Sequence, residues 1–142
     1  MLCVMIMAGC TPSRIDPPVM RYGRDTCDQC RMIIAEKQFA CAIYQAHQGY
    51  LKFDSIGCLI QWHGDGLKKE DRVWVHSYEN QKWIAGLTAY YVHVKDLQTP
   101  MGFGLIAFET QAATHAYDGK IMRFEDLTLF VQNLNVDQQK NQ

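Results

Sequence analysis

The chain contains 142 residues, of which 48% are hydrophobic and 20% are charged, and its formal net charge is −1. That composition fits one soluble globular domain, or two very small ones, and the length allows a moderate core. The near-neutral charge, without any basic block, gives no reason to expect nucleic acid as a partner.

The first ten residues, MLCVMIMAGC, form an apolar run shorter than the roughly 20 residues that a bilayer span requires. The run resembles the end of a secretory signal, and Met7-Ala8-Gly9-Cys10 resembles a bacterial lipobox. We therefore expect residues 1–10 to be a signal peptide and lipobox remnant, with Cys10 lipidated and anchoring an exported protein through acyl chains. The alternative is a buried apolar strand that ends in Gly-Cys. Residues 11–24 are rich in proline and are expected to form a flexible tether.

The hydrophobic pattern predicts a first unit over residues 25–66. Its expected strands are residues 32–34, residues 39–44 and a third that begins at residue 51. Asp54 or Ser55 can cap a helix that begins at Ile56 and ends before the glycines at 64–66.

Residues 67–98 are expected to connect this unit to a second one. The connecting strands are expected at residues 73–75, 82–84 and 89–92. The second unit covers residues 99–133, and its expected elements are a strand at 104–108, a short helix at 111–115 capped by Thr110, a strand at 121–124 and a helix from Glu125 through Val131. The polar tail, residues 134–142, is expected to fray.

The two units look like an internal repeat. Residues 52–59 (KFDSIGCL) align with residues 123–130 (RFEDLTLF), each with a basic residue, Phe and an acidic residue before an apolar helix. The same register sets Cys30 opposite Met101. We therefore predict an α+β protein in which two small homologous ββαβ units form one compact body. The alternative is a pair of unrelated strand–turn–strand–helix units.

The most informative motif is C-x-x-C-x-M, formed by Cys27, Cys30 and Met32. Thiolate and thioether ligands together favour soft metals, above all Cu(I). The two cysteines lie in a polar stretch before the first expected strand, so we expect an accessible thiol pair on a loop.

Other interpretations of the cysteines stay open on spacing alone. Cys27, Cys30, Cys41 and Cys58 could form two disulfides instead of a metal site. A thiol–disulfide oxidoreductase using Cys27 and Cys30 is an alternative function, although its motif usually begins a helix, which residues 32–34 do not resemble. Structural zinc is disfavoured because Cys41 and Cys58 are isolated in the sequence and form no second short-spaced pair.

Two residues outside this motif are further candidates for copper ligands. Met101 lies in the sequence TPMGFG, a constrained loop in which methionine is unusual unless its sulfur is used. With Cys30 opposite Met101, we expect the site in a cleft between the two halves. Among the five histidines, His76 at the end of an expected strand is the best candidate for an imidazole ligand.

The sequence does not indicate an enzyme. It contains no G-x-S-x-G, H-E-x-x-H, P-loop or G-x-G-x-x-G motif, and its acidic residues form no persuasive acid–base pair. We therefore expect a protein that binds a metal and turns over no substrate.

Taken together, these motifs resemble the NosL family, the copper-binding lipoproteins associated with nitrous oxide reductase. The resemblance runs from about Asp25 to Val131. The residues that carry it are Cys27, Cys30, Met32-Ile33-Ile34, Phe53, Ser55, Val75-His76, Ala89-Tyr90-Tyr91-Val92, Met101-Gly102, Ala107-Phe108 and Arg123-Phe124-Glu125.

The resemblance implies a copper chaperone that delivers Cu(I) for maturation of nitrous oxide reductase. The ligands that it implies are Cys27, Cys30, Met32, Met101 and His76. The expected partners are the reductase and an ABC-transporter-type maturation complex. The chain would face the periplasm on a lipid anchor, in the inner or outer membrane, as a monomer or weak dimer.

Two positions depart from the family pattern. Many members have cysteine directly after the phenylalanine at the start of the helix, where this chain has Asp54, and Cys58 is the candidate substitute. Arg31 replaces the usual glycine after Cys30, and its charge should favour the Cys30 thiolate over the thiol.

Overall fold

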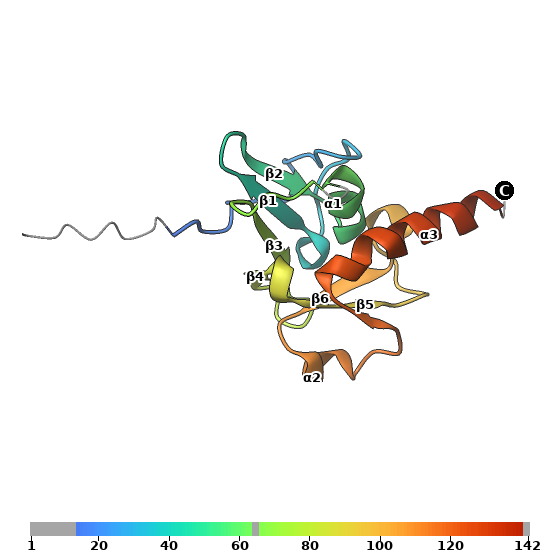
Figure 1. The fold of residues 1–142 in the computed structure, drawn as a ribbon. Helices are drawn as coiled ribbons and strands as arrows, with labels where there is room; N and C mark the ends of the chain where they lie inside the picture. The colour runs from blue at the N-terminus through green and yellow to red at the C-terminus, as the bar shows by residue number, and fades with distance from the viewer. Residues whose placement is uncertain (1–13, 64–65, 141–142) are drawn as a thin grey trace, which may run out of the picture.

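The computed structural model describes residues 14–63 and 66–140, and it contains two antiparallel sheets (Figure 1). The first sheet has the order β2-β1-β3-β4, formed by β1 (Cys41–Gln45), β2 (Gly49–Phe53), β3 (Arg72–His76) and β4 (Trp83–Ala85). The second has the order β6-β5-β7, formed by β5 (Tyr90–His93), β6 (Leu105–Phe108) and β7 (Ile121–Met122). The helices are α1 (Ile56–His63), α2 (Gln111–Thr114) and α3 (Leu127–Lys140). The mixed α+β class expected from the sequence is therefore confirmed.

The first sheet is built around β1, whose residues Cys41, Ala42 and Ile43 are completely buried. Cys41 pairs with Phe53 on β2 and with Val75 on β3, so the strand is flanked on both edges. Apolar residues on both faces are typical of such a central strand. Gly49, with a φ of 79°, begins β2 after the turn and adopts a conformation that other residues rarely take.

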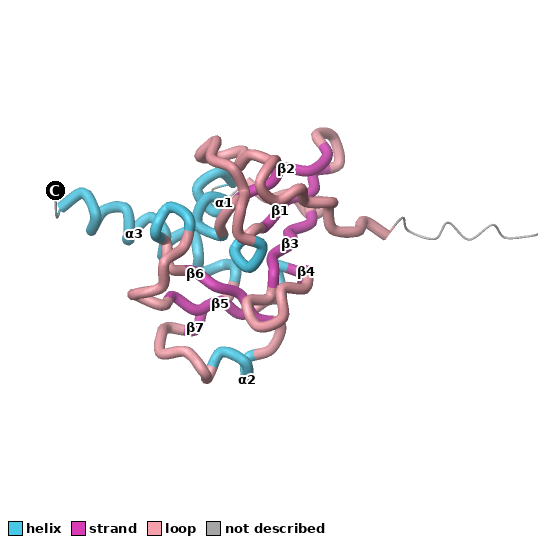
Figure 2. The backbone as a smooth tube through the Cα atoms, turned by 180° about the vertical axis from the view of Figure 1, so that it is seen from behind, coloured by secondary structure: helices cyan, strands magenta, loops and turns pink. Residues whose placement is uncertain are grey.

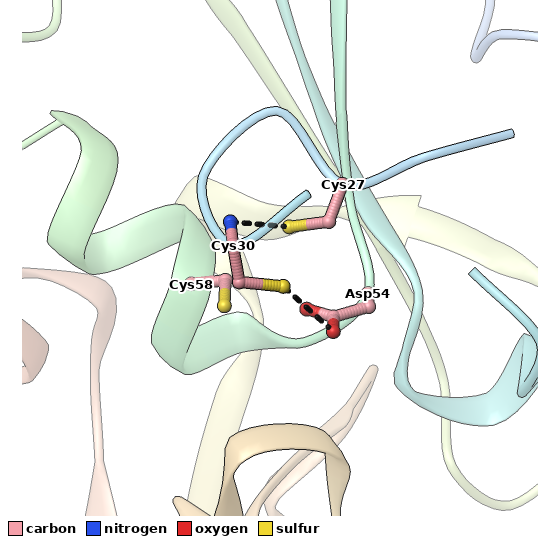
Figure 3. Close-up of side chains that lie close together, drawn as sticks. All are labelled: Cys27, Cys30, Asp54 and Cys58. Atoms are coloured by element: carbon pink, nitrogen blue, oxygen red, sulfur yellow. Dashed lines mark hydrogen bonds between the residues drawn. The ribbon is translucent and has the colours of Figure 1, made fainter. Parts of the chain in front are cut away.

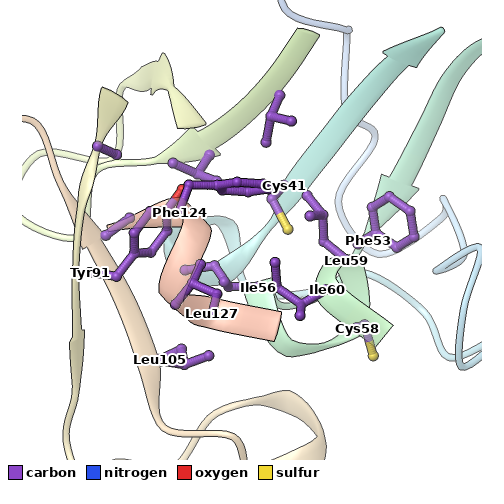
Figure 4. Packing of buried hydrophobic residues seen from close by; sticks show 14 of the residues in the cluster. Cys41, Phe53, Ile56, Cys58, Leu59, Ile60, Tyr91, Leu105, Phe124 and Leu127 are labelled. Carbon is purple, nitrogen blue, oxygen red and sulfur yellow. The ribbon is translucent and has the colours of Figure 1, made fainter. Parts of the chain in front are cut away.

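Both sheets share one hydrophobic core, in which α1 and α3 pack against each other (Figure 4). Phe53 and Ile56 come from the first half, while Tyr91, Phe124 and Leu127 come from the second. A smaller cluster on the other side of the second sheet is formed by Phe39, Val92, Ile106 and Phe108. The two halves therefore meet through packed side chains.

The structure differs from the sequence expectations at both ends of the described chain. Residues 32–34 form no strand; the only pairing there is an isolated bridge between Thr26 and Ile33. From Asp16 onward, the expected tether lies against β2, because Asp16 O accepts a hydrogen bond from the Tyr50 hydroxyl and Val19 O accepts one from Lys52 Nζ at 2.8 Å. Cys10 and the rest of the expected signal lie outside the described residues.

The expected polar tail is helical as far as Lys140, so α3 is longer than predicted. Its C-terminal part extends away from the body in both views (Figures 1 and 2). The second sheet is centred on β5, which the sequence analysis assigned to the connecting strands. Across residues 14–63 and 66–140, no helix has the length and hydropathy needed to cross a membrane.

Candidate metal centre

The C-x-x-C segment is a closed loop that lies along β2. Its ends are joined by the hydrogen bond from Cys27 N to Met32 O at 2.8 Å, and Arg31 N donates to Cys27 O at 3.0 Å. Arg31 adopts a φ of 67°, which turns the chain back on itself. Asp28 and Lys52 exchange two hydrogen bonds, from Asp28 N to Lys52 O at 2.8 Å and from Lys52 N to Asp28 Oδ2 at 2.7 Å. The edge of the first sheet therefore fixes this loop.

The junction between β2 and α1 supplies the other half of the site. Asp54 follows the last residue of β2, and Cys58 lies in the first turn of α1. Ser55 caps this helix: its hydroxyl accepts a hydrogen bond from Cys58 N at 3.3 Å, and its carbonyl accepts one from Leu59 N at 3.2 Å. A strand end and a helix start thus bring a carboxylate and a thiol to one place.

Four side chains converge there: Cys27, Cys30, Asp54 and Cys58 (Figure 3). Their candidate ligand atoms all lie within 4.8 Å of one another. Cys30 Sγ donates to Asp54 Oδ2 at 3.3 Å, and Cys30 N donates to Cys27 Sγ at 3.5 Å. Cys27 and Cys58 are completely buried and Cys30 is partly exposed, so the group opens towards solvent on the Cys30 side.

The three thiols of this group differ in acidity. The hydrogen bond from the Cys58 thiol lowers the pKa of Cys27 to about 6, against the opposing effect of burial. The same bond raises the pKa of Cys58. Burial, followed by the hydrogen bond to Asp54, raises the pKa of Cys30 to about 11. Cys27 is therefore the most acidic of the three thiols.

This result corrects the expected role of Arg31. The sequence analysis expected its charge to favour a thiolate at Cys30, but the pKa of Cys30 is raised. The Arg31 side chain is 76% exposed and its nearest acidic partner is Asp28, at 3.9 Å. A cation in that position is largely solvated, while burial and a neighbouring carboxylate both oppose ionisation of Cys30.

The donor atoms of the group fit a metal ion. Asp54 Oδ1 is buried and has no hydrogen-bond partner among the described residues, although a buried carboxylate oxygen normally has one. Three sulfur donors match a soft ion such as Cu(I), and a bound cation would provide the partner that this oxygen lacks.

Three of the expectations for the cysteines change with the fold. Cys27 is buried, so the motif is not the accessible pair that was expected. Cys58 is isolated in the sequence but adjacent in space, so the argument against a closed site with four ligands no longer holds. Cys41 lies elsewhere in the core, and all four cysteines among the described residues are free thiols.

The expected methionine ligands are both exposed. The Met32 side chain directly follows the cysteine loop and is 58% exposed. Met101 is 50% exposed, and its φ of 59° puts it in the left-handed region at the tip of its loop. That loop reaches α1 through Phe103, whose ring lies so close to Gly57 that a Cβ there would be 2.0 Å from Phe103 Cδ2. Met101 is therefore two residues from a side chain that packs beside Cys58.

His76 occupies a different place from the one expected for a ligand. It is buried, with Nδ1 donating to Ala40 O at 2.8 Å and Nε2 3.2 Å from the Tyr22 hydroxyl. Its ring also lies over Trp83, with centroids 3.7 Å apart. Burial lowers the pKa of His76, which favours the neutral imidazole. His76 is not part of the four-residue group, and ligation would require it to give up one of these hydrogen bonds.

Sequence reasoning did not propose Asp54 as a ligand and named Cys58 only as a substitute. A usable signal was present: Cys58 follows the capping Ser55 by three residues, so its thiol had to lie in the first turn of the helix. What was missing was the pairing of Asp28 with Lys52, which brings the cysteine loop to that turn.

Comparisons with known proteins identify a family and a similar fold. The model of the NosL family matches residues 18–131. The crystal structure of the copper chaperone NosL from Shewanella denitrificans is similar, with a TM-score of 0.57 and 22% sequence identity over 78% of this chain and 96% of that one. No curated protein matches the chain.

Proposed function

The chain belongs to the NosL family, and from this premise we propose that it is a copper chaperone. The cargo is one Cu(I) ion, bound and passed on without substrate turnover. The observation that supports this most strongly is the convergence of three thiols on a buried carboxylate oxygen without a partner. Soft sulfur donors favour Cu(I) over harder cations.

We assign the first contacts with copper to the cysteines. Cys27 is the more acidic thiol and Cys30 is the partly exposed thiol beside it. Cys58 and Asp54, at the junction of β2 and α1, complete the group. Copper held by two or three sulfurs leaves room for an incoming ligand, which suits transfer to a partner.

We propose that the exposed Met32 and Met101 side chains contact copper during its uptake and release. Both thioethers are at least half exposed, so they can meet copper as it arrives or leaves. His76 remains the candidate imidazole from the sequence, but its two hydrogen bonds argue against it.

The family and the N-terminal sequence support a proposal about the cellular setting of the protein. We propose lipidation at Cys10, a periplasm-facing position, and transfer of copper to nitrous oxide reductase through an ABC-transporter-type maturation complex. Internal duplication into two ββαβ units is also kept as a proposal. It is supported by Phe53 and Phe124, which are both buried just before α1 and α3.

Anaerobic titration with Cu(I) in competition with a chromophoric chelator tests the proposed site. The parent chain should bind one Cu(I), and Cys30→Ser should weaken binding by at least about tenfold because one thiolate is lost. Cys41→Ser is the matched control, since it removes a buried thiol outside the group. Equal affinity of Cys30→Ser and the parent would show that the site is wrongly placed.

The same titration tests whether Met101 and Met32 are copper ligands. Met101→Leu and Met32→Leu keep the apolar volume but remove the thioether. Weaker binding or faster release of Cu(I) identifies a ligand. An active thiol–disulfide oxidoreductase would instead reduce insulin and be indifferent to Met32→Leu.

A further inference from the structure

The loop that carries Cys27 and Cys30 is held at its base by a mostly buried ion pair. The base is closed by two hydrogen bonds of 2.8 Å, from Ile34 N to Asp25 O and from Gly23 N to Ile34 O. The Asp25 side chain is 6% exposed, and its carboxylate forms an ion pair with Lys52 Nζ at 2.5 Å. The ion pair thus lies two residues before Cys27 in the chain.

Lys52 contacts the loop and its surroundings at several points. Its main chain forms the two hydrogen bonds with Asp28, so it also holds the tip of the loop. Its ammonium group, on a side chain that is 23% exposed, also donates to Val19 O at 2.8 Å. Lys52 lies on β2 two residues before Asp54. One residue therefore joins the element that carries Asp54 to the base and the tip of the cysteine loop.

The second cation on Asp25 is less well placed to do this. Arg21 Nε lies 2.9 Å from Asp25 Oδ1, but the Arg21 side chain is 69% exposed. Exposed ion pairs contribute little because water screens them, whereas a mostly buried pair is costly to break on one side only. Arg21 is also only four residues away in the chain, so it cannot fix the loop to the sheet.

From these contacts we infer that Asp25 and Lys52 are a positioning pair for the metal centre. The pair touches no copper; it fixes the cysteine loop against β2 so that Cys27 and Cys30 face Asp54 and Cys58. This rests on the proposed function, because it concerns how tightly and how long the same site holds Cu(I). Outer contacts that orient metal ligands commonly change affinity by about 10–100-fold.

The test compares Cu(I) affinity and the rate of release to a chelator in the full chain. Lys52→Met removes the ammonium group but leaves the main-chain contacts with Asp28. We expect it to weaken Cu(I) binding about tenfold and to speed release by a similar factor, with unchanged far-UV circular dichroism. Lys52→Arg should restore most of both values. Lys82→Met, at an exposed lysine outside the loop, is the matched control and should behave as the parent.

A double-mutant cycle tests whether Asp25 and Lys52 act through one shared interaction. Asp25→Asn keeps the shape of the side chain and should shift affinity and release in the same direction as Lys52→Met, including in the case that Lys52→Met does not fold. The double variant should cost clearly less than the sum of the two single changes, since both remove the same ion pair. Parent-like affinity and release in either folded single variant overturns the inference, as does simple addition of the two effects.

Cu(I) binding by the parent chain separates failure of the proposed function from failure of the positioning pair. If the parent does not bind Cu(I), the copper proposal fails, and Cd(II), another thiolate-seeking ion followed by its ultraviolet charge-transfer band, tests the positioning pair. Weaker Cd(II) binding by Lys52→Met, rescued by Lys52→Arg, would support the pair in that case. Equal Cd(II) binding by the parent and Lys52→Met would reject it, as would failure of the parent to bind Cd(II).

Discussion

At the scale of single residues, identical side chains in this protein have different chemistry because their neighbours differ. Cys27 and Cys30 are three residues apart, yet the pKa of one is lowered to about 6 and that of the other raised to about 11. Cys27 receives hydrogen bonds, while Cys30 faces the Asp54 carboxylate. In the candidate metal centre, the more acidic thiol thus lies beside one that is harder to deprotonate, and a thiol must lose its proton to bind a metal ion.

The two hydrogen bonds of buried His76 are expected to stabilise the fold. His76→Phe should lower the free energy of unfolding by ~1–3 kcal/mol, because Ala40 O loses its donor and the Tyr22 hydroxyl its acceptor. Urea unfolding of the metal-free protein measures this. Cu(I) affinity should change less than about threefold, a margin below that of an outer-contact loss. A loss of tenfold or more would contradict this placement and show that His76 supports copper binding, as a ligand or through a contact that orients one.

The same residue predicts a pH dependence. Burial lowers the pKa of folded His76, so the unfolded chain binds more protons below the ordinary value of about 6.5. The stability of the parent should therefore be fully present above that value and should fall as the pH drops below it. Comparison of urea midpoints over this range should show a smaller fall in His76→Phe.

At the scale of elements, the start of α1 connects the cysteine group to the second half of the molecule. Cys58 faces the cysteine loop, and its neighbour Gly57 lies beneath the ring of Phe103. Phe103 ends the loop that carries Met101. A glycine is required here for space and not for its backbone angles, since only a residue without a Cβ allows the ring to approach.

Gly57→Ala should consequently destabilise the protein. Alanine favours a helix over glycine by about 1 kcal/mol, but the new methyl group would collide with Phe103, and overpacking typically costs ~1–3 kcal/mol. Thermal or urea unfolding gives the sign. Phe103→Leu is the partner variant: in its presence Gly57→Ala should cost less, because the smaller side chain can move aside. A stabilised Gly57→Ala would contradict the described packing.

At the scale of the whole molecule, the shared core makes the two sheets interdependent. Phe124 and Leu127 in the second half bury against the same cluster as Phe53 and Ile56 in the first. Neither half closes this core alone, since α1 contacts β1 and β2 of the first sheet, β6 of the second sheet, and α3. Cooperative unfolding of both halves is expected from such an arrangement.

Two spectroscopic probes can check this cooperativity. The chain has three tryptophans, at positions 62, 74 and 83, all in α1 or the first sheet, so their fluorescence reports on the first half. Far-UV circular dichroism also reports on α3. We expect the two urea transitions to coincide; a separate, earlier loss of helix without a change in fluorescence would show that α3 unfolds alone.

Much of the fold could be predicted from the sequence because local patterns specify it. The apolar run with buried residues on both faces predicted β1, and the Asp54-Ser55 pair before an apolar segment predicted α1. The strand expected at residues 32–34 was wrong because these residues pair only with the short segment 23–27 across the turn, through one isolated bridge, and join neither sheet. Apolar character alone cannot distinguish an exposed loop residue such as Ile33 from a strand residue.

The sequence by itself determined the family, the α+β class and the soft-metal character of the C-x-x-C-x-M motif, because these depend on residue types and short spacings. Only the tertiary structure decided which side chains meet. Asp54 and Cys58 join Cys27 and Cys30 through the pairing of the loop with β2, while His76 is turned to Ala40 and Tyr22. Contacts between residues distant in the chain depend on packing, and the hydrophobic pattern of one segment carries no record of its partner.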